Sequence, residues 1–249
     1  MTAARGALAA LALLTRVPVP RHPAPGPGAV GWFGPVGLLL GSSAALPAWL
    51  ALRWGWRGQA SMIAAVLVVA WWAWGTRMLH WDGLADAADA AWGAADPASR
   101  LAVMADTRTG AFGATAVALV ALGQASAIGA SLTAGRVWPL VLAPVLGRSA
   151  ASLLVWGLRP ARSGGLGAAL AGPAPVGGVL ASSAAVAVAV ALVRLEEPSA
   201  AAAAAFTGLA VAIAVPFVVA RPFRGYTGDV LGASVLLVET AALMIAGIL

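Results

Sequence analysis

The feature that most constrains the fold of this chain is a succession of long apolar stretches separated by short polar connections. An α-helix needs about 20 predominantly apolar residues to cross a bilayer. Only 10% of the residues are charged and 61% are hydrophobic, whereas soluble domains carry about 25% charged residues. Seven stretches approach the required length, at 30–52, 60–79, 110–132, 137–158, 168–193, 200–219 and 230–248. The sequence therefore predicts an all-α, polytopic bundle of about seven transmembrane helices, with residues 1–249 forming a single integral membrane domain.

A shorter apolar run at 6–14 follows Arg5 and ends at Thr15-Arg16, where a signal peptide would carry a small-residue cleavage site. We expect a retained interfacial or re-entrant helix. The chain has no cysteine, which excludes disulfides and thiolate metal sites. Its basic residues are scattered singly and form no basic stripe, so nucleic acid is not an expected partner. The lipid bilayer is an expected partner. The sequence leaves the oligomeric state open, and a homo-oligomer is one possibility.

The arginines predict the orientation of the bundle, because their excess marks the cytoplasmic side. One side of the predicted spans receives four arginines, Arg53, Arg57, Arg136 and Arg194. The other receives ten, Arg5, Arg16, Arg21, Arg77, Arg100, Arg108, Arg159, Arg162, Arg221 and Arg224. This predicts a cell (inner) membrane protein with a cytoplasmic amino terminus. Residues 82–106, 159–167 and 221–229 would then share the cytoplasmic side and could line one site.

Five of the nine acidic residues lie within 82–106. Asp82, Asp86 and Asp89 are spaced i, i+4 and i+7, so a helix places all three on one face. Carboxylates this close repel one another unless a cation lies among them, and oxygen ligands suit magnesium. The leading hypothesis is a Mg²⁺ site, and the alternative is a solvated acidic helix face.

Two glycine-rich segments lead directly into predicted spans. The first contains Asp106, Arg108 and Gly110, and the second contains Thr227-Gly228-Asp229. The unpaired amides and positive dipole end of each helix could hold a phosphate, and Arg108 would add a bidentate grip. For the second segment, plain helix capping by Asp229 and a flexible turn is the alternative.

Three further ionisable residues stand in apolar sequence. Arg148 and Glu239 both fall roughly 14 to 15 Å deep at 1.5 Å per residue. Charges at such a depth are costly unless they are paired or line a wet cavity. We predict that they are partners and leave open a structural ion pair or a direct substrate contact. His80 points about 160° away from the face shared by Asp86 and its neighbours on a continuous helix, which argues against shared metal ligation.

Several separated motifs follow one another along the chain: Leu14 to Pro20, His80 to Asp89, Met104 to Gly110, Gly147-Arg148, and Thr227 to Ala233 continuing to Glu239. In this order and over nearly the whole chain they resemble the cobalamin synthase (adenosylcobinamide-GDP ribazoletransferase) family. The resemblance implies a magnesium-dependent membrane transferase. It would join adenosylcobinamide-GDP to α-ribazole or its 5′-phosphate, release GMP and complete the nucleotide loop of adenosylcobalamin.

The residue chemistry agrees with that implied reaction, because a diphosphate must be neutralised before an alcohol attacks phosphorus. We expect Mg²⁺ on Asp82, Asp86 and Asp89, and Asp229 to bind metal or orient the nucleophile. The expected phosphate and substrate contacts are Arg108, Asp106, Gly110, Thr227, Gly228, Arg148 and Glu239. Asp89 or His80 would be the general base. The alternatives are another membrane-embedded magnesium-dependent phosphotransferase or prenyltransferase and, ranked lower, a transporter with an Arg148–Glu239 relay.

Overall fold

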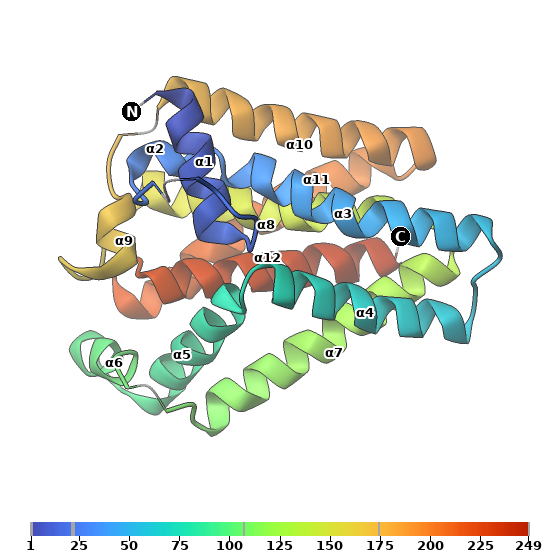
Figure 1. Cartoon of the computed structure of the whole chain (residues 1–249). Helices are drawn as coiled ribbons and strands as arrows, with labels where there is room; N and C mark the ends of the chain where they lie inside the picture. The colour runs from blue at the N-terminus through green and yellow to red at the C-terminus, as the bar shows by residue number, and fades with distance from the viewer. Residues whose placement is uncertain (1, 21–22, 107, 174, 249) are drawn as a thin grey trace.

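The structure is a computed structural model of the chain and describes residues 2–20, 23–106, 108–173 and 175–248. Within these ranges it contains helices and no β-strand (Figure 1). The helices are α1 (Ala3–Leu14), α2 (Pro27–Val30), α3 (Phe33–Arg53), α4 (Gln59–Gly75), α5 (Leu79–Gly93), α6 (Pro97–Val103), α7 (Ala111–Thr133), α8 (Trp138–Gly157), α9 (Gly165–Leu170), α10 (Val176–Glu196), α11 (Ala201–Ala220), the 3₁₀ helix η1 (Arg221–Phe223) and α12 (Gly228–Ile248).

Six helices of the described chain are long and apolar enough to cross a membrane: α3, α7, α8, α10, α11 (continued by η1) and α12. The helix α4 has 17 residues and lies beside α3 and α7 in the bundle (Figure 1). It reaches the length of a span only together with α5, and the two are bent by 90°. The prediction of an all-α membrane bundle is confirmed, with α4 as its short seventh member.

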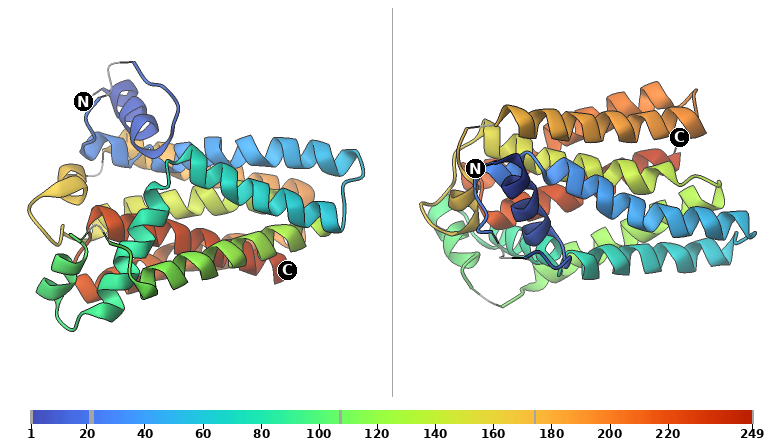
Figure 2. Two further views of the ribbon diagram at one scale, coloured as in Figure 1. Left: turned by 60° about the horizontal axis from the view of Figure 1, so that its bottom comes forward. Right: turned by 45° about the horizontal axis from the view of Figure 1, so that its top comes forward.

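The helix α1 lies across one end of the bundle, at a steep angle to the spans in both views of Figure 2. Its 12 residues extend for about 18 Å, which is too short to cross a bilayer about 30 Å thick. Gly6, Ala9, Ala10 and Leu14 face the protein. The position of α1 agrees with an interfacial helix.

The centre of the bundle is α8, in which 83% of the apolar window is buried, followed by α12 with 67%. Glycines allow α3 to approach α8 closely. A Cβ atom at Gly37 would lie 2.4 Å from the carbonyl oxygen of Pro144, and one at Gly41 would lie 2.6 Å from that of Leu140. Pro144 has no N–H to bind the Leu140 carbonyl within the helix. The glycines of α3 thus let its backbone pack directly against the part of α8 around Pro144.

The break between α4 and α5 sets the position of the acidic segment. Arg77 and Met78 adopt left-handed backbone angles, with φ of 55° and 60°, and the helix axis turns by 90°. The helix α5 therefore does not continue in the direction of α4, and the two helices form a broken span or a re-entrant segment. Here the prediction of one helix over 60–79 was wrong, because α4 ends at Gly75.

The segments predicted to share one side do lie at one end of the bundle. In Figure 1 the acidic helix α5, the start of α7, the end of α8, α9 and the start of α12 all gather there. A parallel bridge joins Pro160 to Tyr226, and the Arg100 guanidinium donates to the Pro222 carbonyl at 2.9 Å. The helix α9 is separate from α10, so the predicted span at 168–193 begins later than expected, at Val176.

Candidate active site

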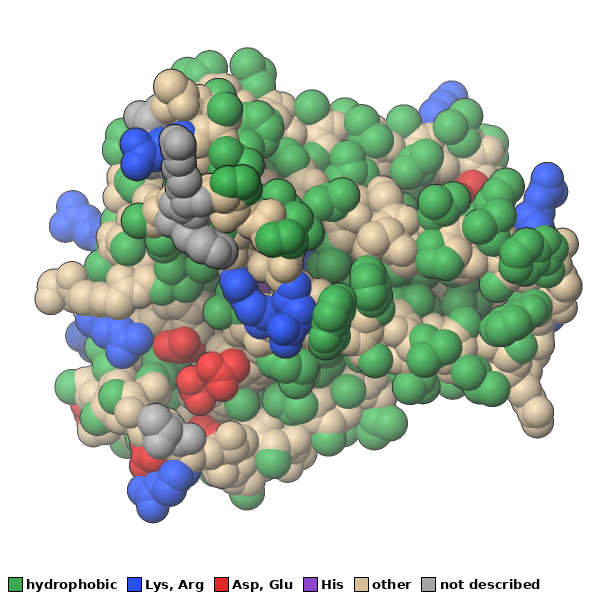
Figure 3. Space-filling model, in the orientation of Figure 1, with side chains coloured by type: hydrophobic (Ala, Val, Ile, Leu, Met, Phe, Trp, Pro, Cys, Tyr) green, Lys and Arg blue, Asp and Glu red, His purple; other side chains and the backbone are tan. Residues whose placement is uncertain are grey.

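The three aspartates of α5 form its only polar stripe. Asp82 is exposed and Asp86 and Asp89 are half-buried, whereas the residues between them are buried. Figure 3 shows acidic side chains gathered on this part of the surface. We call Asp82, Asp86 and Asp89 of α5, together with Asp229 of α12, the acidic face. The shared face that the i, i+4, i+7 spacing predicts is present.

The carboxylates of the acidic face are close enough to influence one another electrostatically. Burial raises the pKa of Asp86 to about 6, and the nearby charges of Asp82, Asp229 and Asp89 add to that rise. Neither Asp82 nor Asp86 accepts a side-chain hydrogen bond or forms an ion pair within the described chain. Their carboxylate oxygens therefore remain available to a ligand.

Asp229 reaches this cluster because α5 and α12 approach closely. A Cβ atom at Gly83 would lie 2.8 Å from the backbone oxygen of Asp229, so a larger residue there would separate the two helices. Arg162 Nη2 lies 3.6 Å from Asp229 Oδ2, and the Thr227 hydroxyl lies 3.3 Å from the same oxygen. Thr227 Oγ1 also accepts a hydrogen bond from the Val230 amide at 3.2 Å. The cap of α12 is thus Thr227, followed by Gly228 at the start of the helix.

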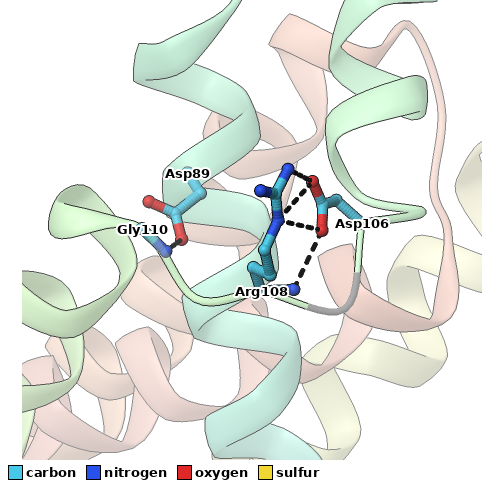
Figure 4. Close-up of polar contacts among 4 residues, drawn as sticks. All are labelled: Asp89, Asp106, Arg108 and Gly110. Atoms are coloured by element: carbon cyan, nitrogen blue, oxygen red, sulfur yellow. Dashed lines mark hydrogen bonds and ion pairs between the residues drawn. The ribbon is translucent and has the colours of Figure 1, made fainter.

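Asp89 of α5 binds backbone amides at the start of α7. Its carboxylate accepts a hydrogen bond from the Gly110 amide at 2.6 Å (Figure 4). It accepts a second one from the Gly113 amide at 2.8 Å. A Cβ atom at either glycine would come within 2.5 Å of an Asp89 oxygen. The amides that the sequence offered to a phosphate are therefore bound by a carboxylate in this structure. A helix cap between Asp89 and Gly110 was not predicted, although the Gly110 and Gly113 spacing could have indicated a close approach.

Arg108 and Asp106 bind each other in the exposed loop before α7 (Figure 4). Arg108 Nε donates to Asp106 Oδ1 at 3.0 Å and Nη2 donates to Oδ2 at 2.6 Å. These hydrogen bonds lower the pKa of Asp106 to about 2. The Arg108 side chain is 87% exposed, so a change of rotamer could bring it to a phosphate. Thr107 between them lies outside the described residues.

Beneath α5 lies a buried charged group. Arg148 of α8 and Glu239 of α12 form an ion pair with both side chains 2% exposed, which confirms the predicted partnership. His80 and Arg148 line one cavity of about 30 Å³, together with residues including Leu13 and Gly232. His80 is buried and lies on the side of α5 away from the acidic face, as its helical spacing predicts. The Arg148–Glu239 ion pair and His80 therefore lie in the interior of the bundle.

The donor chemistry of the acidic face fits a magnesium ion, because all four side chains offer carboxylate oxygens. In the described parts of the chain, no three His, Asp or Glu side chains stand close enough to hold a metal ion together. Asp89 is the member most firmly engaged elsewhere, by the α7 amides. Asp82, Asp86 and Asp229 remain to close around a cation.

Comparison with known proteins adds to this geometry. The family model for cobalamin-5-phosphate synthase matches residues 6–247. Relatives named adenosylcobinamide-GDP ribazoletransferase include one from Alkalilimnicola ehrlichii, 40% identical over 98% of this chain and 95% of the relative. Another, from Ectopseudomonas mendocina, is 36% identical over 94% of this chain and 95% of the relative.

A third relative with that name, from Syntrophobacter fumaroxidans, is 44% identical, but the match spans 55% of this chain and 54% of the relative. No solved structure matches the chain. The family model and the two long matches cover nearly every residue, including both helices that carry the acidic face. The chain belongs to the cobalamin-5-phosphate synthase family.

Proposed function

We propose that this chain transfers the adenosylcobinamide phosphate group from adenosylcobinamide-GDP to α-ribazole or its 5′-phosphate, releasing GMP, with Mg²⁺ as cofactor. The observation that carries the proposal is the acidic face, built by α5 and α12 in a chain of this family. Its carboxylates suit a reaction at a diphosphate, where a divalent cation neutralises the phosphoryl charge and stabilises the leaving phosphate.

The protein residues would divide the work as follows. Asp82, Asp86 and Asp229 would hold the cation, and Asp89 would join them or keep the start of α7 in place. Arg108 and Arg162 lie at the edges of the acidic face and would bind phosphate oxygens. The ribose hydroxyl forms the new bond to phosphorus as the bond to the GMP oxygen breaks. The ribose hydroxyl must also lose its proton. Because His80 is buried, we assign the uptake of that proton to a carboxylate of the acidic face.

Arg148 and Glu239 would act indirectly in this proposal. Their ion pair links α8 to α12 below the acidic face, and we assign to it the positioning of α12 and therefore of Asp229. Arg100, Arg159 and Arg221 of the arginine-rich side belong to α6, the α8–α9 connection and η1, which lie at the same end of the bundle as the acidic face. We therefore propose that the site opens to the cytoplasm.

The direct test is GMP release by the purified protein in detergent, from adenosylcobinamide-GDP and α-ribazole with and without Mg²⁺. We expect release that depends on Mg²⁺ and is lost in Asp82→Asn. Asp96→Asn is the matched control, because Asp96 is exposed and only caps α6. Magnesium-dependent release at full rate by Asp82→Asn would overturn the assignment.

A further inference from the structure

A large groove lies between α3 and α4 and extends from the end where these two helices are joined to Trp74, near the other end of α4. Its volume is about 720 Å³, within the range of about 300–1,000 Å³ for ligand pockets. The walls are almost wholly apolar and include Ala44, Ala48, Ala51, Leu67, Val68 and Trp71. The one hydroxyl that lines it, Ser43, accepts a hydrogen bond from Trp71 Nε1 at 2.9 Å. An occupant must therefore be apolar along this stretch.

The length of the groove matches one leaflet of a bilayer. On α3 its lining extends from Ser43 to Trp54, about 16 Å at 1.5 Å per residue. That is half of a hydrocarbon core about 30 Å thick. Ser43 is the middle residue of the 21 in α3, so the α3 wall extends from the middle of that helix to its end, and the α4 wall extends from Ala64 to Trp74, close to the end of α4. A lipid acyl chain has this reach, whereas a partner helix would continue across both leaflets.

At the surface end the groove adjoins a second cavity of about 420 Å³, lined by Gly55, Trp56, Arg57, Ala60 and Ile63. Trp56 lines both. Arg53 stands just before Trp54 and stacks on the Trp49 ring. Within the described chain neither Arg53 nor Arg57 forms an ion pair. Arg57 thus lines the cavity that adjoins the groove, and Arg53 lies on α3 between the lining residues Ala51 and Trp54.

The carboxylates at this end of the bundle are already engaged. Glu196 accepts hydrogen bonds from the Val137 and Trp138 amides, and Glu197 pairs with Arg136. Among the described residues at this end, Arg53, Arg57 and Arg194 therefore have no acidic side chain paired with them. Figure 3 shows basic side chains at this end, opposite the acidic face. An anionic phosphate would balance this charge.

We propose that the groove between α3 and α4 binds one anionic phospholipid, with an acyl chain against the alanine-lined wall and the headgroup phosphate at Arg53 and Arg57. The proposal concerns the opposite end of the bundle from the acidic face and does not depend on the reaction assigned there. It also predicts selectivity for headgroup charge, because only the arginines distinguish an anionic from a zwitterionic lipid of the same chain length.

The test is native mass spectrometry of the full-length protein after delipidation in detergent, with phosphatidylglycerol or phosphatidylcholine added back. We expect a single phosphatidylglycerol to bind more tightly than phosphatidylcholine. Arg57→Gln should weaken phosphatidylglycerol binding roughly fivefold and leave phosphatidylcholine unchanged. Arg194→Gln is the control, because Arg194 is exposed at the same end and lines neither cavity. Equal binding of both lipids to the wild type would overturn the proposal.

A second pair of variants tests the groove itself. Ala51→Phe places a ring in the groove and should remove the bound lipid, whereas Ala210→Phe adds the same ring to an exposed position of α11 and should not. Thermal unfolding checks that both variants fold, and if Ala51→Phe does not, the arginine comparison decides. A dimer that Ala51→Phe dissociates would show instead that a second copy of the chain fills the groove.

Discussion

Replacing Asp86 by asparagine tests whether burial and the neighbouring carboxylates of the acidic face make the charge of Asp86 unfavourable in the absence of a cation. The pKa of Asp86 is raised from 3.8 to about 6, so the folded protein takes up this proton before the unfolded chain does. The unfolding free energy contributed by Asp86 therefore falls as pH rises from about 4 to about 6. The penalty is complete above pH 6 and absent below about pH 4.

The expected size follows from the shift. About two pKa units correspond to about 3 kcal/mol at 1.36 kcal/mol per unit, and Asp86 is partly exposed to solvent. Screening by water reduces this to about 1 to 2 kcal/mol. Asparagine keeps the shape and removes the charge. Metal-free Asp86→Asn should therefore be more stable than the wild type by that amount at pH 8, and equal to it at pH 4.

Tryptophan fluorescence can follow unfolding in detergent, because the chain has eleven tryptophans. The measurement is made with chelator at pH 4, 6 and 8, and repeated at pH 8 with Mg²⁺, which should stabilise the wild type more than the variant. Asp96→Ala is the control of opposite sign: it removes the α6 cap, formed through the Ala98 and Ser99 amides, and should be destabilising. A metal-free Asp86→Asn protein that is less stable than the wild type at pH 8 would refute the reasoning.

Two further predictions concern the packing that supports the acidic face. Gly83→Ala should push α5 away from α12 and lower GMP release strongly, whereas Gly93→Ala, whose Cβ would meet nothing within 4 Å, should not; equal activity would contradict the close approach. Arg148→Leu and Glu239→Leu should each lower the unfolding free energy by about 3 to 5 kcal/mol, and the double variant by less than either. Thermal unfolding measures this, and additive losses would speak against the buried pair.

The sequence was sufficient wherever a periodic pattern acts on one continuous helix. Hydropathy located the spans, because the bilayer fixes the length of an apolar helix. Helical spacing placed Asp82, Asp86 and Asp89 together and His80 on the other side. The matching depths of Arg148 and Glu239 predicted their ion pair, because an isolated charge at that depth is costly.

The sequence was not sufficient where the fold depends on the backbone between helices. At the 90° bend, Arg77 and Met78 adopt left-handed backbone angles, which are uncommon for both residue types and which the sequence therefore does not predict. The pairing of Asp89 with the α7 amides joins segments whose distance depends on that bend. Likewise, Arg108 binds Asp106 because the short loop brings them together. Their spacing in the sequence does not show whether Arg108 binds Asp106 or a phosphate.

The most direct test of the account is whether α5 and α12 hold one divalent cation together. Electron paramagnetic resonance can measure the binding of Mn²⁺, as a substitute for Mg²⁺, to the purified protein in detergent. The account predicts one site, competed by Mg²⁺, that both Asp82→Asn and Asp229→Asn weaken strongly, whereas Asp96→Asn does not. Unchanged Mn²⁺ affinity in Asp229→Asn, with the protein folded, would show that the two helices do not share a metal site.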